Sequence, residues 1–219
     1  MQITCEVEGL SIVLVGNFNP AIFQPTWLAR QGLISDAAAT NAEIDIIRPE
    51  LTSFKVGGLK LLVQLDRFQA EAVTPDEAGR VRDLVVGTFR ILEHTPVRQM
   101  GINRHMHFRM ASETVWHAVG HRLAPKEAWK GLLENPGTRS LVIEGQRPGS
   151  PSRRFAVTVQ PSQRVQPGVY IGTNEHYEAS GDEGPAGLME MLAAQFEPSQ
   201  QYARQLAENL LGECQESDE

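Results

Sequence analysis

Four of the six histidines lie close together in the stretch GINRHMHFRMASETVWHAVGH. His105 and His107 are separated by one residue, so on a strand both side chains point to the same face. His117 and His121 are four residues apart, so on a helix they share one face. Four imidazoles that converge can bind zinc or another transition metal. One interpretation of this stretch is therefore the site of a metal-dependent hydrolase.

The same stretch also fits a purely structural role. If Met106 and Phe108 are core residues, alternation places the two strand histidines on the exposed face. No sequence feature places the strand pair opposite the helix pair. Glu113, one turn before His117, could be a ligand or a base, but the His-Glu-x-x-His pattern is missing and no cysteine is nearby. We therefore assign no catalytic residue, no metal ligand and no cofactor, and keep the hydrolase as the alternative.

Two further polar pairs, Asp66–Arg67 and Glu175–His176, occupy matching positions in the segments QLDRFQA and TNEHYEA. They could form two equivalent polar sites. The other interpretation is that they are charge pairs on the surface beside a β-bulge. Structural ion pairs are common in proteins, so the surface interpretation is the one we adopt.

Composition limits the partners that the chain can have. The formal net charge of −7 disfavours a phosphate backbone as partner, so no nucleic acid is expected. Three arginines lie in the loop QRPGSPSRR, which reads as a solvated hairpin tip: Arg147, Arg153 and Arg154. No apolar run is long enough to cross a bilayer, so no membrane partner is expected.

The cysteines and the first residues indicate the compartment. Cys5 and Cys214 lie near opposite ends of the chain, and we expect two free thiols in a reducing cytoplasm. The first residues, MQITCEVEGL, contain neither a basic segment nor a long apolar segment, so no secretory signal is expected.

The elements that must position these residues follow from the apolar pattern. Strands are predicted over residues 10–18, 42–50, 51–56, 59–73, 97–110, 139–145, 153–159 and 168–179. Helices are predicted over residues 20–34, 75–94, 113–123, 126–134, 187–196 and 199–212.

Single residues set several of these predictions. Gly57-Gly58 indicates a hairpin turn, and a phase shift at Asp66-Arg67 indicates a bulge. Ser112 is expected to cap the helix that follows it, and Pro198 to kink or break the last helix. In TPDE, the threonine and glutamate are expected to form a capping box. The three tryptophans are expected to anchor the core from helices: Trp27, Trp116 and Trp129.

The element order suggests an internal duplication. Each half reads strand, helix, three strands, helix, with residues 1–97 as the first half, 98–213 as the second and 214–219 as a flexible acidic tail. The match of QLDRFQA to TNEHYEA supports this, as does NF before the Trp27 helix against HF before the Trp116 helix. Chance similarity between antiparallel strands is the alternative. The fold class predicted is α+β, with antiparallel sheets covered by helices.

Three stretches carry a resemblance: FQPTWLARQGLI, PVRQMGINRHMHF and GLMEMLAAQFEPSQQYARQLAENLLG. Together they resemble a sporadically distributed bacterial family of uncharacterised proteins. The resemblance implies a cytoplasmic prokaryotic protein and supplies no activity or site residues.

From these patterns we predict a non-catalytic protein-binding or assembly module. An unfilled sheet face or the last helix would meet a protein partner or a second copy of the chain. The methionines of GLMEMLAAQF fit such a surface, and they fit packing within the chain equally well.

Overall fold

The computed structural model describes residues 4–179 and 185–212. Its strands are β1 (Cys5–Gly16), β2 (Glu43–Arg48), β3 (Leu51–Val56), β4 (Leu59–Gln64), β5 (Arg67–Ala72), β6 (Val97–Arg109), β7 (Leu141–Gly145), β8 (Arg154–Pro161) and β9 (Gly168–Glu178). Its α-helices are α1 (Pro25–Arg30), α2 (Asp36–Thr40), α3 (Ala78–Ile91), α4 (Glu113–Leu123) and α5 (Ala186–Gly212). Three short 3-10 turns are η1 (Pro20–Ile22), η2 (Pro75–Glu77) and η3 (Glu127–Trp129). The predicted tail and Cys214 lie outside the described residues, in which Cys5 is a free thiol.

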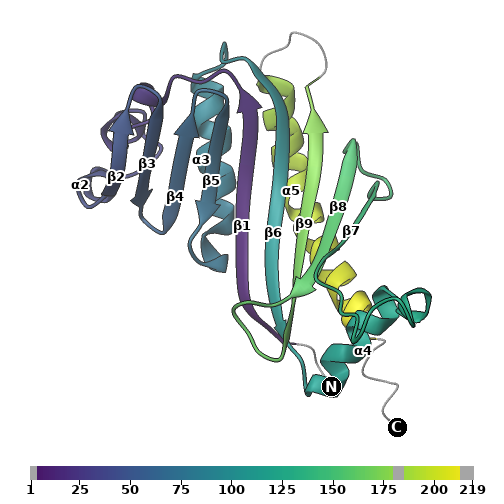
Figure 1. The fold of residues 1–219 in the computed structure, drawn as a ribbon. Helices are drawn as coiled ribbons and strands as arrows, with labels where there is room; N and C mark the ends of the chain where they lie inside the picture. The colour runs from purple at the N-terminus through teal and green to yellow at the C-terminus, as the bar shows by residue number, and fades with distance from the viewer. Residues whose placement is uncertain (1–3, 180–184, 213–219) are drawn as a thin grey trace.

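All nine strands form one antiparallel sheet in the order β2-β3-β4-β5-β1-β6-β9-β8-β7. The helices α3 and α5 lie side by side on one face of this sheet, as Figure 1 shows. The predicted α+β class with helix-covered antiparallel strands is therefore confirmed. None of the helices in the described ranges is long and apolar enough to cross a membrane.

The two halves of the chain share this sheet because β1 pairs with β6 at its centre. The apolar core also continues across residue 97. One buried cluster contains Leu14 and Phe68 from the first half together with Met100, Tyr177 and Phe196 from the second. A second buried cluster, which includes Met106, Val119 and Ala207, is formed by residues of the second half alone. The first half therefore shares its core with the second half, which also has this cluster of its own.

Alternation along the strands explains which face the helices cover. The register places Leu61, Ala70, Ile12 and Ile102 in one row across β4, β5, β1 and β6, and all four are buried. Every second residue of each strand points to this face. The apolar side of α3 packs on β1 and β5, and α5 packs on β6 and β9.

The helix α3 forms within the predicted range, with an apolar face at helical spacing, but its start differs from the prediction. Ala78, Val81, Leu84, Val85 and Thr88 are buried, as the helical spacing predicts. The TPDE segment instead forms η2, and its threonine makes no side-chain cap bond. The glutamate of that segment accepts a hydrogen bond of 2.6 Å from the Arg80 guanidinium, so it is not available for a capping box.

The single helix predicted over residues 20–34 is wrong. The segment forms η1 and α1, and α2 follows over residues that had no predicted element. Gln24 is extended, with φ −117° and ψ 150°, because the residue before a proline disfavours the helical region. Gly32 adopts φ 72° and ends the helical path.

The bulge predicted at Asp66-Arg67 is also wrong. Residues 59–73 form two strands, β4 and β5, which pair with each other around a tight turn at Leu65-Asp66. The apolar phase shifts there because the chain reverses, and Leu65 is 53% exposed in the turn. The first half therefore has one strand more than the predicted unit.

The duplication remains a prediction. The QLDRFQA match makes Leu14 equivalent to Met100, because these residues pair with the aromatic residues of the two matched segments. The NF and HF match instead makes Leu14 equivalent to Arg104. The two matches therefore do not describe one superposition of the halves.

The last helix is continuous through Pro198, so a break is wrong and the kink stays a prediction. The helix is held by its packing: Leu192 and Phe196 before the proline are buried, and so are Ser199 and Ala203 after it. Packing of an amphipathic face outweighs the missing hydrogen bond of one proline. The methionines of this helix pack against the core, which agrees with the intramolecular interpretation.

Replacing Pro198 with alanine should stabilise the protein. Proline inside a helix removes one backbone hydrogen bond and is unfavourable by about 3 kcal/mol in an exposed helix. Pro198 is exposed, so we expect Pro198→Ala to raise the free energy of unfolding by about 1–3 kcal/mol in urea titrations. Gln201→Ala, at an exposed site three residues later, is the control and should change it by less than about 0.5 kcal/mol. A destabilised Pro198→Ala variant would show that the tertiary packing requires the proline.

Candidate functional site

His105 and His107 lie on the face of the sheet that α3 and α5 leave open. Both alternate with the buried Met106 on β6, as expected for one strand face. The Nδ1 atom of His105 lies 2.7 Å from the hydroxyl of Tyr170 on the neighbouring strand β9. The Nδ1 atom of His107 lies 2.9 Å from the hydroxyl of Ser162. His107 is 9% exposed, so the prediction that both histidines are exposed holds only for His105.

The Ser162 hydroxyl determines which ring nitrogen of His107 is left without a proton. Its oxygen accepts hydrogen bonds from the backbone N–H groups of Arg164 and Val165, at 3.1 and 3.0 Å. Its own proton is then directed to Nδ1 of His107, which must be unprotonated to accept it. Burial holds the pKa of His107 below its ordinary value, and the positive charge of Arg164 adds to this effect. His107 is thus a neutral residue that holds the loop after β8.

His117 and His121 lie on a different element, α4. Ser112 caps this helix as predicted, accepting a hydrogen bond of 3.2 Å from the N–H of Val115. Both histidines line a cleft beside the helix, away from the hydroxyl partners of the β6 pair. Within residues 4–179 and 185–212, no three His, Cys, Asp or Glu side chains are grouped to hold a metal ion. The structure therefore does not bring the four histidines together.

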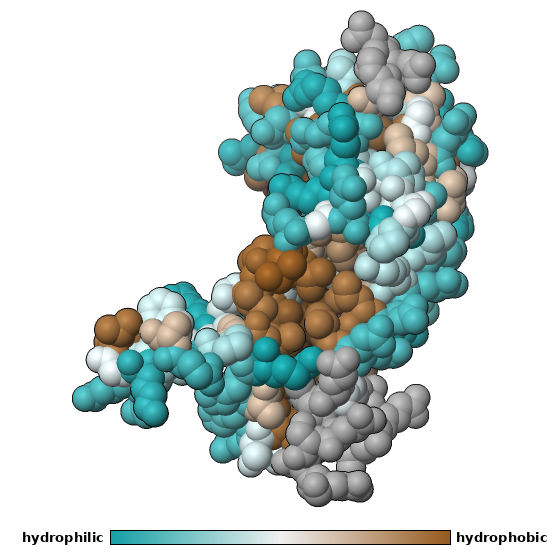
Figure 2. Space-filling model, turned by 90° about the vertical axis from the view of Figure 1, so that its right-hand side faces the viewer, coloured by the Kyte–Doolittle hydropathy of each residue, from teal (hydrophilic) through white to brown (hydrophobic). Residues whose placement is uncertain are grey.

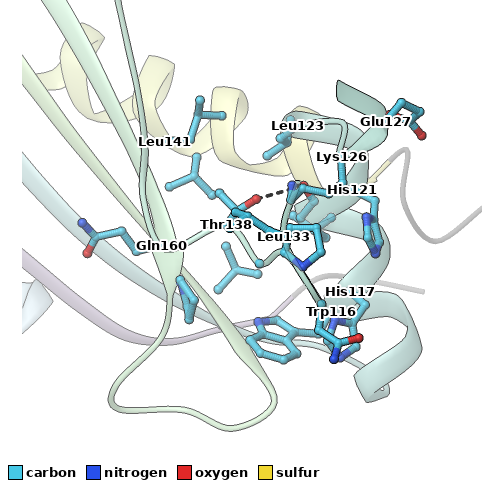
Figure 3. A pocket seen from close by; sticks show the side chains of 18 of the residues that line it. Trp116, His117, His121, Leu123, Lys126, Glu127, Leu133, Thr138, Leu141 and Gln160 are labelled. Carbon is cyan, nitrogen blue, oxygen red and sulfur yellow. Dashed lines mark hydrogen bonds between the residues drawn. The ribbon is translucent and has the colours of Figure 1, made fainter. Parts of the chain in front are cut away.

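A cleft lies beside α4. It has a volume of about 730 Å³ and lies between α4, residues 126–138 and the strands β7 and β8. Figure 3 shows side chains from these segments that line it. Its apolar lining comes from Trp116, Val119, Leu123, Leu133, Leu141 and Val159. This volume is in the range of known ligand pockets, and the lining is mostly apolar.

Large apolar side chains also surround the cleft on the outside. Leu132, Leu133, Val142 and Ile143 are each more than half exposed. The space-filling view in Figure 2 shows a hollowed apolar patch on the side of the molecule that carries β7 and β8. Contiguous exposed apolar surface of this kind is unusual in a monomeric soluble protein and marks interaction sites.

The helix predicted over residues 126–134 is wrong, and so is the core position of Trp129. Only the 3-10 turn η3 forms, and Gly131 with φ 82° prevents a continuing helix. Trp129 is 50% exposed at the border of the apolar patch. Trp27 and Trp116, in contrast, are partly buried against the two apolar clusters.

Two polar side chains of the cleft, Lys126 and Thr138, contact the end of α4. The ammonium group of Lys126 donates to the carbonyl oxygens of Gly120, at 3.1 Å, and Ala124. The Thr138 hydroxyl donates to the Gly120 carbonyl at 3.5 Å. The Gly120 carbonyl also accepts a hydrogen bond of 3.2 Å from the backbone N–H of Ala124, so these contacts lie together at the last turn of α4. The cleft is therefore suited to bind apolar groups through shape complementarity.

Glu175 is completely buried, which the surface interpretation did not anticipate. It lies on the helix-covered face of β9 and pairs with Ile102 across the sheet. Its carboxylate accepts hydrogen bonds from the Arg147 guanidinium at 2.8 Å and the Ser150 hydroxyl at 2.7 Å. Burial raises the pKa of Glu175, but bonds from Ser150, Ser199 and Arg147 outweigh it, and the net pKa is lowered.

Arg147 is correspondingly buried, so the prediction of a solvated tip is wrong for this arginine. It also donates a hydrogen bond of 2.6 Å to Gln195 of α5, and thereby fastens the loop between β7 and β8 to the helix. Arg153 and Arg154 of the same loop are exposed, as predicted. Alternation of Ile171, Glu175 and Tyr177 was the signal that could have placed the carboxylate inside.

A second buried cation lies under α5. The Arg104 guanidinium is paired with Glu8 of β1 and donates a hydrogen bond of 2.7 Å to Gln200 of α5. Burial, followed by the charge of Arg204, lowers its pKa to about 10. Together with Arg147, this residue links α5 to the sheet by polar contacts at two points.

The pairs Asp66–Arg67 and Glu175–His176 do not form equivalent sites. Asp66 lies in the turn between β4 and β5, and the exposed Arg67 donates to Gln69 at 3.1 Å. His176 lies on the open face of β9, opposite to Glu175, and 3.7 Å from the carboxylate of Glu178. The four positions therefore occupy three different environments.

Loss of Arg147 should strongly destabilise the protein. Arg147→Ala leaves a buried carboxylate without its cation, a change that typically reduces the free energy of unfolding by about 3–5 kcal/mol. Arg153→Ala is the control, because its pair with Glu178 is exposed and should contribute about 0–1 kcal/mol. The double variant Arg147→Met with Glu175→Leu should recover part of the loss. Equal effects of Arg147→Ala and Arg153→Ala in urea titrations would contradict the buried pair.

His107 should make stability depend on pH in the mildly acidic range. Its pKa is lowered by folding, so the unfolded chain binds more protons near the ordinary histidine pKa of about 6.5. Stability is then complete above that pH and decreases as the pH falls below it. His107→Asn keeps an acceptor for Ser162 and does not titrate, so urea midpoints should fall less between pH 7 and pH 5. A His107→Asn variant with the wild-type dependence on pH would contradict this role of His107.

A scan against protein-family models found no matching family, and a search of curated proteins found no match. The resemblance to the sporadically distributed bacterial family therefore stays a prediction. The function of the chain must be inferred from the geometry described above.

Proposed function

We propose that the chain is a non-catalytic binding module that docks an apolar segment of a protein partner in the cleft beside α4. The observation that carries this proposal is the exposed apolar surface that continues from the cleft onto β7 and residues 129–133. Burial of apolar surface contributes roughly 25 cal/mol per Å², so a partner that covers this region gains free energy.

The polar groups of the cleft support binding over catalysis. An active site needs converging polar groups around a reacting atom. Here Lys126 and Thr138 are directed to the carbonyl groups of α4. His117, His121 and Glu127 also line the cleft, but within the described residues they form no group that could hold a metal ion. The alternative, a metal-dependent hydrolase on His105, His107, His117 and His121, has no specific observation in its favour, since these residues are divided between the open sheet face and α4.

Charge favours a separate protein over nucleic acid or a second copy. The chain has a net charge of −7, which disfavours binding to a phosphate backbone. The segment beside the cleft departs from this balance, because residues 122–139 contain four Lys or Arg and two Glu. A symmetric dimer through this surface would bring the same cations together. Because the sequence resembles a family of bacterial proteins, we further propose that the protein acts in the bacterial cytoplasm.

Selection from a random peptide library displayed on phage tests this function. Peptides enriched on the wild-type protein should bind Leu133→Asp at least roughly tenfold more weakly, because loss of a central apolar contact commonly costs 1–2 kcal/mol or more. Leu133 lines the cleft and is 56% exposed, so the variant should fold. The matched control is Leu65→Asp, at a leucine that is 53% exposed in the turn between β4 and β5.

Two outcomes would overturn the proposal. One is that no enriched peptide distinguishes Leu133→Asp from Leu65→Asp. The other is that sedimentation shows a stable dimer that Leu133→Asp dissociates, because the second copy would then occupy the cleft.

A further inference from the structure

The strand β7 is the last strand of the sheet on the side of the apolar cleft. It pairs with β8 on one side, and no described strand pairs with the other side. The backbone N–H and C=O groups of its outer edge are therefore available to a further strand. Natural proteins usually protect such edges with charged residues, bulges or covering loops.

The opposite edge of the sheet shows this protection. On β2, Glu43 and Asp45 carry charge, and a register shift interrupts the pairing with β3. Both carboxylates are engaged, Glu43 with Lys55 at 3.2 Å and Asp45 with Ser53 at 2.9 Å. The strand β7 begins with three apolar residues in succession and carries one carboxylate, Glu144, which lies 3.5 Å from Arg154.

Val142 and Ile143 indicate how a partner would cover this edge. They are consecutive residues of a strand, so their side chains point to opposite faces of the sheet. They are nevertheless 53% and 58% exposed. A partner that only fills the cleft covers one face of β7. A strand added beside β7 places side chains next to both residues.

The charges near this edge select the partner's composition. Lys126 and Lys130 line the cleft together with one carboxylate, Glu127, and Arg139 lies two residues before β7. This local excess of positive charge, in a chain with net charge −7, favours a segment that carries carboxylates. Two copies of β7 paired about a symmetry axis would bring their cationic segments into proximity, which disfavours the second copy as occupant.

We propose that β7 accepts an extended segment of another protein as an additional strand, and that this segment is apolar in its centre and acidic at its flanks. The proposal rests on the proposed function and specifies how the partner binds. The main-chain hydrogen bonds supply affinity, and the side chains over Val142, Ile143 and the cleft supply specificity.

A synthetic probe tests this mode of binding. The probe is a peptide rich in valine and isoleucine with two aspartates at each end, in one form with normal amides and in another with alternate amides N-methylated. The methyl groups can be placed on the odd or on the even amides of the peptide. In fluorescence anisotropy, at least one of these two forms should bind roughly tenfold more weakly, because its amides cannot pair with the edge of β7. Replacing the aspartates with lysines should weaken binding by a similar factor, and more at low salt.

Variants of the protein separate strand addition from simple docking in the cleft. Val142→Asp alters the open face of β7, outside the cleft lining, and should weaken the acidic probe roughly tenfold. Val73→Asp is the matched control, at a valine that is 54% exposed away from the patch. On binding, hydrogen exchange should slow at alternate amides of residues 141–145.

The outcomes distinguish this proposal from the proposed function. If peptides depend on Leu133 but ignore Val142→Asp, N-methylation and the amides of β7, strand addition is wrong and docking in the cleft stands. If no peptide depends on Leu133, the proposed function fails as well. A dimer that Val142→Asp dissociates would show that a second copy occupies the edge, and would also overturn the proposal.

Discussion

The pairing of β1 with β6 is the interaction on which the rest of the structure depends. It joins the strands of the two halves into one sheet, and so places α3 and α5 side by side on one face. The shared core that results contains residues from both halves, and a second buried cluster around Met106 and Ile171 is formed by the second half alone. The long register of this pair also aligns the outer strands, which determines where β2 and β7 end the sheet.

The attachment of α5 combines apolar and polar contacts. Its apolar residues would allow the helix to slide along a smooth sheet face. Arg104 and Arg147 restrict it, because each guanidinium bonds a carboxylate of the sheet and a glutamine of the helix: Glu8 with Gln200, and Glu175 with Gln195. Buried ion pairs are weak sources of stability, since desolvation offsets their attraction, and their attested use is to fix one arrangement. Arg147 also holds the loop after β7, so the edge strand is presented in a defined position.

The two edges of the sheet therefore have different characters. The β2 edge carries one exposed isoleucine, Ile44, between charges that are paired within the chain, whereas the β7 edge carries exposed valine and isoleucine next to an apolar cleft. Residues 126–138 form only a short 3-10 turn and close the cleft from one side. Exposed apolar residues therefore lie together at one end of the sheet, beside a local excess of cations.

Local patterns in the sequence determined most of the elements. Alternation identified the strands, Ser112 marked the start of α4, and the spacing of α3 gave its buried face. The errors lie where packing competes with propensity, as at Pro198, or where a turn imitates a bulge, as at Asp66.

Only the tertiary structure decided which polar residues are buried and which apolar residues are exposed. Periodicity tells which side chains share a face, but not whether another element covers that face. Glu175 is thus inside because α5 lies over it, and Ile143 is outside because no described strand follows β7. The histidines are close in sequence yet divided between β6 and α4, because a strand and a helix that are adjacent in the chain need not face each other.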